Sequence, residues 1–241
     1  MNHPVPRLLN LPRLAAIGAI MLLSGCLTIE EHYTFKKDGS GTMEYVMDLS
    51  EIGSMMDALG SSDQGEDGGK KAKQKKKDKA QDDSMLAGME AQAKQLEQLQ
   101  GIKKVKMKTE KDGYLGRLSF AFADVAALNR ALNVLMPDST RPDRQFFRWE
   151  GAVLVRTGSA YARNLGTEMT GDGSDSLDIS QVLESMKYKF SFAFANDVQD
   201  VGAAYGVVVD RPKPKQLELA TDWRVIMNDP KALDLRIVLD K

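Results

Sequence analysis

Apolar and polar residues alternate along two short stretches near the start of the chain, and this pattern predicts a β-hairpin. Ile29, Tyr33 and Phe35 alternate with polar positions, as expected for a strand with one buried face. The same period returns over 43–49, and the segment between the two stretches is rich in turn-forming residues. The adjacent acids Glu30 and Glu31 are expected on the solvent face of the first strand.

Helical spacing alternates with further strand-like segments along the rest of the chain. Asp124 is a natural N-cap, and Gly101 and Pro137 are expected to end helices. We expect helices over about 50–59, 85–100, 124–136 and 179–186. We expect strands over 102–110, 114–123, 146–149, 152–156, 188–194, 215–221 and 233–239. Hairpins separated by helices predict an α+β fold, with an antiparallel sheet built from hairpins and helices packed on one face.

One segment interrupts this pattern. Residues 60–84 contain no aromatic residue and no aliphatic residue larger than alanine, and they carry seven lysines among six acids. Such a composition favours a disordered, Lys-rich insert, although the lysines also suit an electrostatic contact. The predicted organisation is therefore a leader over 1–25, the first hairpin and short helix over 26–59, the insert over 60–84, and the remainder of the same domain over 85–241.

The N-terminal segment has the features of a secretory signal. It carries Arg7 and Arg13 and no acidic residue, and an apolar run of about ten residues follows, too short to span a bilayer as a helix. The run ends at Leu23-Ser24-Gly25-Cys26, and Cys26 is the only cysteine of the chain. This ending resembles the lipobox of bacterial lipoproteins.

The resemblance implies that Leu23, Ser24 and Gly25 are recognised by the processing machinery and that Cys26 becomes the acylated first residue. The protein would then be held at a membrane of the bacterial cell envelope by its N-terminal lipid. The alternative is an ordinary secreted protein with a cysteine at its cleavage site. Leu27 stands where lipoproteins of the inner membrane often carry Asp, which favours the outer membrane and a domain facing the periplasm.

Other segments are similar to a group of poorly characterised bacterial lipoproteins, including the domain of the mycobacterial LppM lipoprotein. The similarity is carried by the lipobox and the strand directly after it, by 37–42 and 47–50, and by the late 188–192 segment. For the LppM domain, lipid binding is suspected. The family implies no catalytic residues, and the C-terminus differs because it shows no transmembrane helix.

Composition argues against several functions. The whole chain has a formal charge of −1. Without its first 25 residues it loses two arginines and no acid, which gives about −3, so we expect no nucleic-acid binding. Of the two histidines only His32 would remain, and an acylated Cys26 would leave no free thiol. We therefore expect no enzyme, metal site or cofactor. The aspartates at 172, 175 and 178 do not follow a calcium-loop spacing.

Methionines gather around the first hairpin and its two helices: Met43, Met47, Met55, Met56, Met85 and Met89. Filling of the core is the ordinary interpretation. The functional interpretation is an adaptable groove for a lipid or another hydrophobic ligand. We therefore predict a non-enzymatic binding module, with a protein-interaction or assembly accessory at the membrane surface as the alternative. A hydrolase ranks third, since no nucleophile and base are paired.

Overall fold

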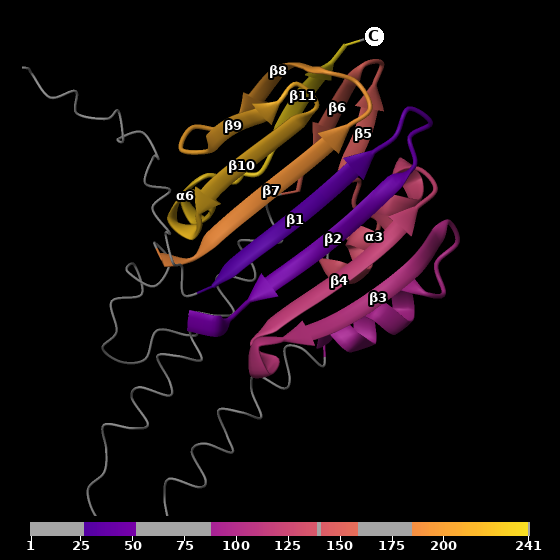
Figure 1. Ribbon diagram of the computed structural model, residues 1–241. Coiled ribbons are helices and arrows are strands. Elements are labelled where there is room, and N and C mark those ends of the chain that lie inside the picture. The colour runs from indigo at the N-terminus through magenta and orange to yellow at the C-terminus, as the bar shows by residue number, and fades with distance from the viewer. Residues whose placement is uncertain (1–26, 52–87, 139–140, 159–184, 241) are drawn as a thin grey trace, which may run out of the picture.

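The computed structural model describes residues 27–51, 88–138, 141–158 and 185–240, and Figure 1 shows their arrangement. A seven-stranded sheet has the order β3-β4-β2-β1-β7-β10-β9. Its strands are β1 (Thr28–Phe35), β2 (Gly41–Asp48), β3 (Ile102–Glu110), β4 (Leu115–Phe122), β7 (Lys187–Phe194), β9 (Val208–Lys213) and β10 (Gln216–Asp222). The 3-10 turn η1 (Lys111–Gly113) joins β3 to β4.

The strand at the start of the described chain lies at the centre of this sheet. β1 pairs antiparallel with β2, from Thr28 opposite Asp48 to Phe35 opposite Gly41. On its other side it pairs parallel with β7, from Thr28 opposite Lys187 to Phe35 opposite Phe194. The other strand pairs of the sheet are antiparallel.

A second layer covers one face of the large sheet (Figure 1). It contains a four-stranded sheet of order β5-β6-β11-β8, with β5 (Phe147–Glu150), β6 (Val153–Arg156), β8 (Val198–Ala203) and β11 (Leu235–Leu239). The helix α3 (Val125–Leu135) lies beside it, and residues 88–96 are also helical. The short helix α6 (Trp223–Asn228) follows β10.

The core between the layers is rich in aromatic rings because β1 and β7 alternate in phase. Ile29, Glu31, Tyr33 and Phe35 are buried on β1, and their partners on β7 are all aromatic: Tyr188, Phe190, Phe192 and Phe194. Tyr33 stacks on Phe192 with ring centroids 5.2 Å apart. From α3, the buried face of Ala127, Leu128, Ala131, Leu132 and Leu135 joins the same core.

The predicted α+β class and its largely antiparallel sheet are confirmed. Most predicted strands and the 124–136 helix are present, and the Asp124 side chain accepts a hydrogen bond from the Ala127 amide at 2.7 Å. The sequence did not reveal β8, β9, α6 or the second sheet. The signal segment, the lipobox, the 60–84 insert and the aspartates at 172–178 lie outside the described residues.

Candidate functional site

A cleft of about 720 Å³ opens at one end of the two sheets, within the ~300–1,000 Å³ of typical ligand pockets. Three connections meet there with the end of β11: 36–39 between β1 and β2, 151–152 between β5 and β6, and 195–196 between β7 and β8. Each segment comes from a different part of the sequence, so the cleft exists only once both sheets are assembled.

The floor of the cleft is apolar and largely aromatic. Phe35 and Phe194, neighbours in the parallel register, stack with centroids 5.8 Å apart. The half-buried ring of Trp149 meets Phe35 edge-on at 5.8 Å, and Leu239 completes the lining. Phe35 and Phe194 are buried, at 2% and 6% exposed, so the half-buried Trp149 and Leu239 supply most of the open apolar surface.

The rim of the cleft carries Lys36, Lys37 and Asp38 from the β1–β2 turn and Asp240 after β11. Lys36 and Lys37 are exposed, and neither ammonium forms an ion pair within the described part of the chain. Asp38, in the same turn, accepts hydrogen bonds from the Ser40 hydroxyl at 2.7 Å and the Ser40 amide at 3.0 Å. These bonds, followed by the charge of nearby Lys36, lower the pKa of Asp38. Both lysines are exposed and hold no ion pair in the described ranges, so their ammonium groups can reach a ligand beside the two acids of the rim.

A buried ionic cluster lies deeper between the sheets. Glu31 of β1 is fully buried, and both of its carboxylate oxygens lie 3.2 Å from Nη2 of Arg156 on β6. The hydroxyls of Tyr33 and Tyr188 also donate to Glu31. Nη1 of Arg156 donates to the Leu233 carbonyl at 2.9 Å. The expectation that Glu31 faces solvent is wrong, because Glu31 shares the inward parity of Ile29 and Tyr33.

The Glu31 carboxylate favours the charged form of Arg156 and the neutral form of Tyr33. Burial alone would lower the pKa of Arg156, but the Glu31 carboxylate offsets it and the pKa is raised. Burial, with Glu31 beside it, raises the pKa of Tyr33 well above its ordinary value. The Arg156 guanidinium also lies 4.3 Å from the ring centre of Phe190. The cluster joins the two sheets, because Glu31 lies on β1 and Arg156 on β6. Both residues are at most 2% exposed, so the cluster is closed to solutes.

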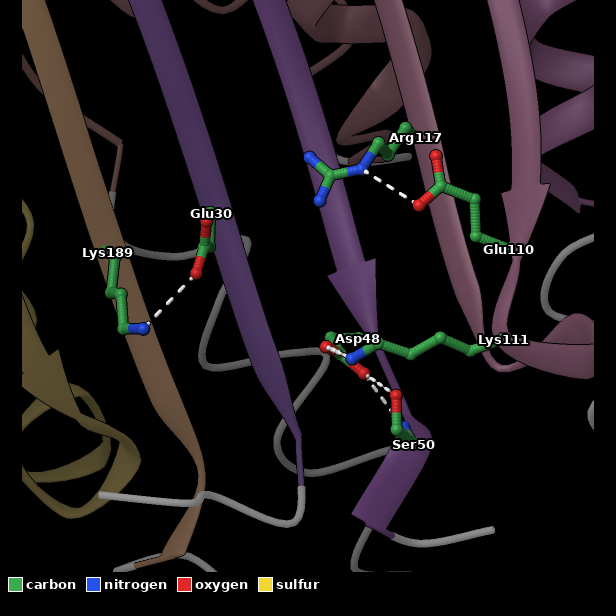
Figure 2. Close-up of polar contacts among 7 residues, drawn as sticks. All are labelled: Glu30, Asp48, Ser50, Glu110, Lys111, Arg117 and Lys189. Carbon is green, nitrogen blue, oxygen red and sulfur yellow. Dashed lines mark hydrogen bonds and ion pairs between the residues drawn. The ribbon is translucent and has the colours of Figure 1, made fainter. Parts of the chain in front are cut away.

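The opposite face of the large sheet is polar, and ion pairs cross it between neighbouring strands (Figure 2). Glu30 lies 3.2 Å from Lys189 and 3.1 Å from His32. The His32 hydrogen bond, with Lys189, outweighs burial and lowers the pKa of Glu30 to about 2. Farther along this face, Lys111 pairs with Asp48 at 2.8 Å. His32 is 37% exposed, as expected for a surface histidine.

The predicted methionine groove is only partly within the described residues. Met43, Met47 and Met89 are 1%, 7% and 3% exposed and belong to the shared core, and none of them lines the cleft. Met55, Met56 and Met85 lie outside the described residues, as do Leu23, Ser24, Gly25 and Cys26. A ligand role for the methionines stays a prediction.

The residues that line the cleft come from several separate segments of the sequence. The segment between the first two strands was predicted as a turn, and Trp149 ends the predicted 146–149 strand. Nothing in the sequence brings positions 36, 149, 194 and 239 together, because their proximity depends on the parallel β1–β7 pairing.

In the described segments, no set of three or more His, Cys, Asp or Glu side chains is placed to hold a metal ion. Within those same residues, no helix has the length and apolar character required to span a bilayer.

No known family matches the sequence, and no curated protein matches it. Among solved structures, the chain is similar to the NMR structure of the folded domain of the Mycobacterium tuberculosis LppM protein. The identity is 13% and the TM-score 0.38, over 92% of this chain and 96% of that one. The sequence motifs indicated a resemblance to this same domain.

Proposed function

We propose that this protein is a lipid-anchored, non-enzymatic binding module whose end cleft takes an amphiphilic ligand with an acidic group. The observation that carries the proposal is the pairing of an aromatic floor with two unpaired lysines on the rim. The floor suits a hydrocarbon chain, and the lysines suit a phosphate or carboxylate.

The lipobox supplies the second half of the proposal. Acylated at Cys26, the chain would stay at the envelope membrane, because two or three acyl chains hold a protein far more firmly than one. Leu27 in place of Asp favours the outer membrane, with the domain in the periplasm. The described fold begins at Leu27, so the domain would lie close to its anchor.

Native mass spectrometry of residues 27–241, secreted to the bacterial periplasm, tests the ligand. We expect a discrete extra mass that denaturation releases as an acidic lipid. The double variant Lys36→Ala/Lys37→Ala should lower the bound fraction several-fold. The charge-matched control is Lys103→Ala/Lys106→Ala, on the exposed edge strand β3, and it should retain the ligand.

A protein that purifies empty and takes up no fluorescent fatty acid would contradict this proposal and favour a protein-interaction role. Crosslinking the acylated protein in its own membrane would then identify the partner. Repeating the crosslinking after deletion of 60–84 would show whether the Lys-rich insert is the contact surface.

A further inference from the structure

The two ends of β1 lie at opposite ends of the large sheet. Phe35, its last residue, forms part of the cleft floor. Leu27, directly before the strand, is fully buried, and its carbonyl accepts a hydrogen bond from the Lys187 amide at 2.8 Å. Eight strand residues at ~3.3 Å each separate the two ends by roughly 25 Å. Residue 26 is therefore attached to the end of the sheet that lies farthest from the cleft.

The structure also shows which elements surround this anchor end. β10 finishes there, with Asp222 opposite Lys187, and the Trp223 amide donates to the Met186 carbonyl at 3.2 Å. The helix α6 follows directly. Gly206, in the turn before β9, lies so close to Val225 of α6 that an added Cβ would come within 3.1 Å of its methyl carbon. The β8–β9 turn is therefore held beside the anchor end.

Exposed apolar side chains gather at this turn. Among the described residues, the large hydrophobics that are exposed are Tyr205, Val208 and Val209, at 98%, 68% and 40%. Tyr205 is in the turn, and Val208 pairs with Ala220, two residues before the end of β10. Tyrosine is favoured at membrane–water interfaces because its ring is apolar and its hydroxyl polar. An almost fully exposed tyrosine at the same end of the sheet as Leu27, with β7 and β10 between β1 and β9, is suited to that environment.

We propose that the β8–β9 turn, through Tyr205 and Val208, rests on the lipid surface that holds the acylated Cys26, so that the cleft opens away from that bilayer. The acyl chains and the turn are then two separate contacts at one end of a rigid sheet, and together they fix its orientation. The ligand enters from the aqueous side and not from the anchoring leaflet. This inference rests on the proposed acylation and, for ligand entry, on the proposed cleft function.

The test uses the full acylated protein, reconstituted in vesicles of phosphatidylethanolamine and phosphatidylglycerol. Since Cys26 carries the lipid, a new cysteine is the only free thiol. Tyr205→Cys and Glu150→Cys, the latter at the exposed end of β5 beside the cleft, each receive an environment-sensitive fluorophore. We expect the label at 205 to shift its emission to shorter wavelength and to be quenched by a head-group quencher. The label at 150 should show neither effect.

Equal responses at the two positions, or a stronger response at 150, would overturn the proposed orientation. A shift at 205 seen in native membranes but not in pure lipid vesicles would assign the turn to a protein partner and also overturn it. Protein that does not float with the vesicles would refute the anchor. None of these results depends on ligand binding, which the native mass measurement decides separately.

Ligand entry is tested with the same vesicles. A fluorescent fatty acid is placed either in the anchoring vesicles or in a second vesicle population that carries no protein. We expect similar uptake rates from the two populations, since the fatty acid reaches the cleft through water in both cases. Faster uptake from the anchoring vesicles would overturn this part of the proposal.

Discussion

At the scale of single residues, the most consequential side chain is Glu31. Its carboxylate is fully buried and holds Arg156 of the opposite sheet together with two tyrosine hydroxyls. A buried ion pair is not by itself a large source of stability, since desolvation offsets much of the attraction. Removing one partner is costly, because the other charge stays buried and unpaired.

We therefore expect Glu31→Gln to lower the free energy of unfolding by about 3–5 kcal/mol. Urea denaturation followed by circular dichroism measures the change. The double variant Glu31→Gln/Arg156→Met should lose less than the two single variants added together, since neither charge is then left alone. Additive losses would show that the two side chains do not depend on each other.

Glu30, the neighbour on the polar face, predicts an acid dependence. Its pKa is lowered from an ordinary 4.5 to about 2 in the folded protein, chiefly by the His32 hydrogen bond. A carboxylate with a lowered folded-state pKa stabilises the fold above its unfolded pKa, and this stabilisation is lost as the pH falls toward 2. We expect a loss of about 1–2 kcal/mol between pH 6 and pH 2.5, reduced by partial exposure.

The measurement is the urea midpoint of the wild-type protein and Glu30→Gln at both pH values. The variant should lose less stability on acidification. Glu218→Gln is the control, because Glu218 is exposed and forms no ion pair within the described ranges. An unchanged pH dependence in Glu30→Gln would show that other groups govern acid unfolding.

Glu31 also shows how far the environment of a single residue can be predicted from the sequence. The parity of the first strand places Glu31 on the same side as Ile29 and Tyr33, so its inward position was readable from the alternation. Its partner was not, because Arg156 is 125 residues away and in the other sheet. Our prediction of a solvent-facing Glu31 overlooked this alternation, and nothing in the sequence indicates the cation that makes its burial tolerable.

At the scale of elements, local patterns predicted the strands with a regular buried face and also the largely exposed β3 and β5, but missed β8 and β9. β9 is exposed along its whole length and contains Pro212, so no alternation marks it. In β8 only Val198 is buried. By contrast β4, β7 and α3 have regular buried faces, and their predicted positions are correct to within one or two residues. β8 and β9 are strands because of the partners they pair with, β11 and β10, and a local pattern does not contain these partners.

Close packing between strands predicts a sharp effect at Gly41, the first residue of β2. An added Cβ would collide with the Thr34 carbonyl oxygen and come within 2.5 Å of Cζ of Phe122. One obstacle is backbone and the other a core ring, so neither yields easily. We expect Gly41→Ala to cost about 2–3 kcal/mol of unfolding free energy. Gly202→Ala in β8 is the matched control, since its nearest contact would be an ordinary 3.6 Å.

Thermal denaturation of the two alanine variants measures how much the crowding at Gly41 costs relative to the open position of Gly202. The melting temperature should fall by several degrees in Gly41→Ala and by little in Gly202→Ala. Similar melting temperatures in both variants would mean that the neighbouring strands move apart to accept the Gly41→Ala methyl group without loss of stability.

At the scale of the whole molecule, the two sheets share one core and should unfold together. Leu154 and Ile237 of the small sheet belong to the same buried cluster as Leu118 and Phe192 of the large one, and Arg156 links them. Trp149 lies on β5 and Trp223 after β10, so each tryptophan reports on a different sheet. We expect Trp149→Phe and Trp223→Phe, each with one remaining tryptophan, to give fluorescence midpoints that coincide with their own far-UV midpoints. A separate midpoint for either probe would indicate two independent units.

The arrangement of the sheets was the part least accessible from the sequence. Hairpins such as β1–β2 and β3–β4 are local and were predicted from turn residues. The parallel β1–β7 pairing joins residues about 160 positions apart, and no turn chemistry encodes it. Because the cleft lies where this pairing ends, its individual residues were visible in the sequence while the cleft itself was not.

The central position of β1 also has a mechanical consequence. A pull on the N-terminal side of the chain acts along a strand that is paired over eight residues on each flank. Such a load strains the flanking backbone hydrogen bonds in shear, all at once, instead of breaking them one after another as at a peeled edge. Under a pull from an attached membrane, β1 would thus be the last strand of the domain to separate.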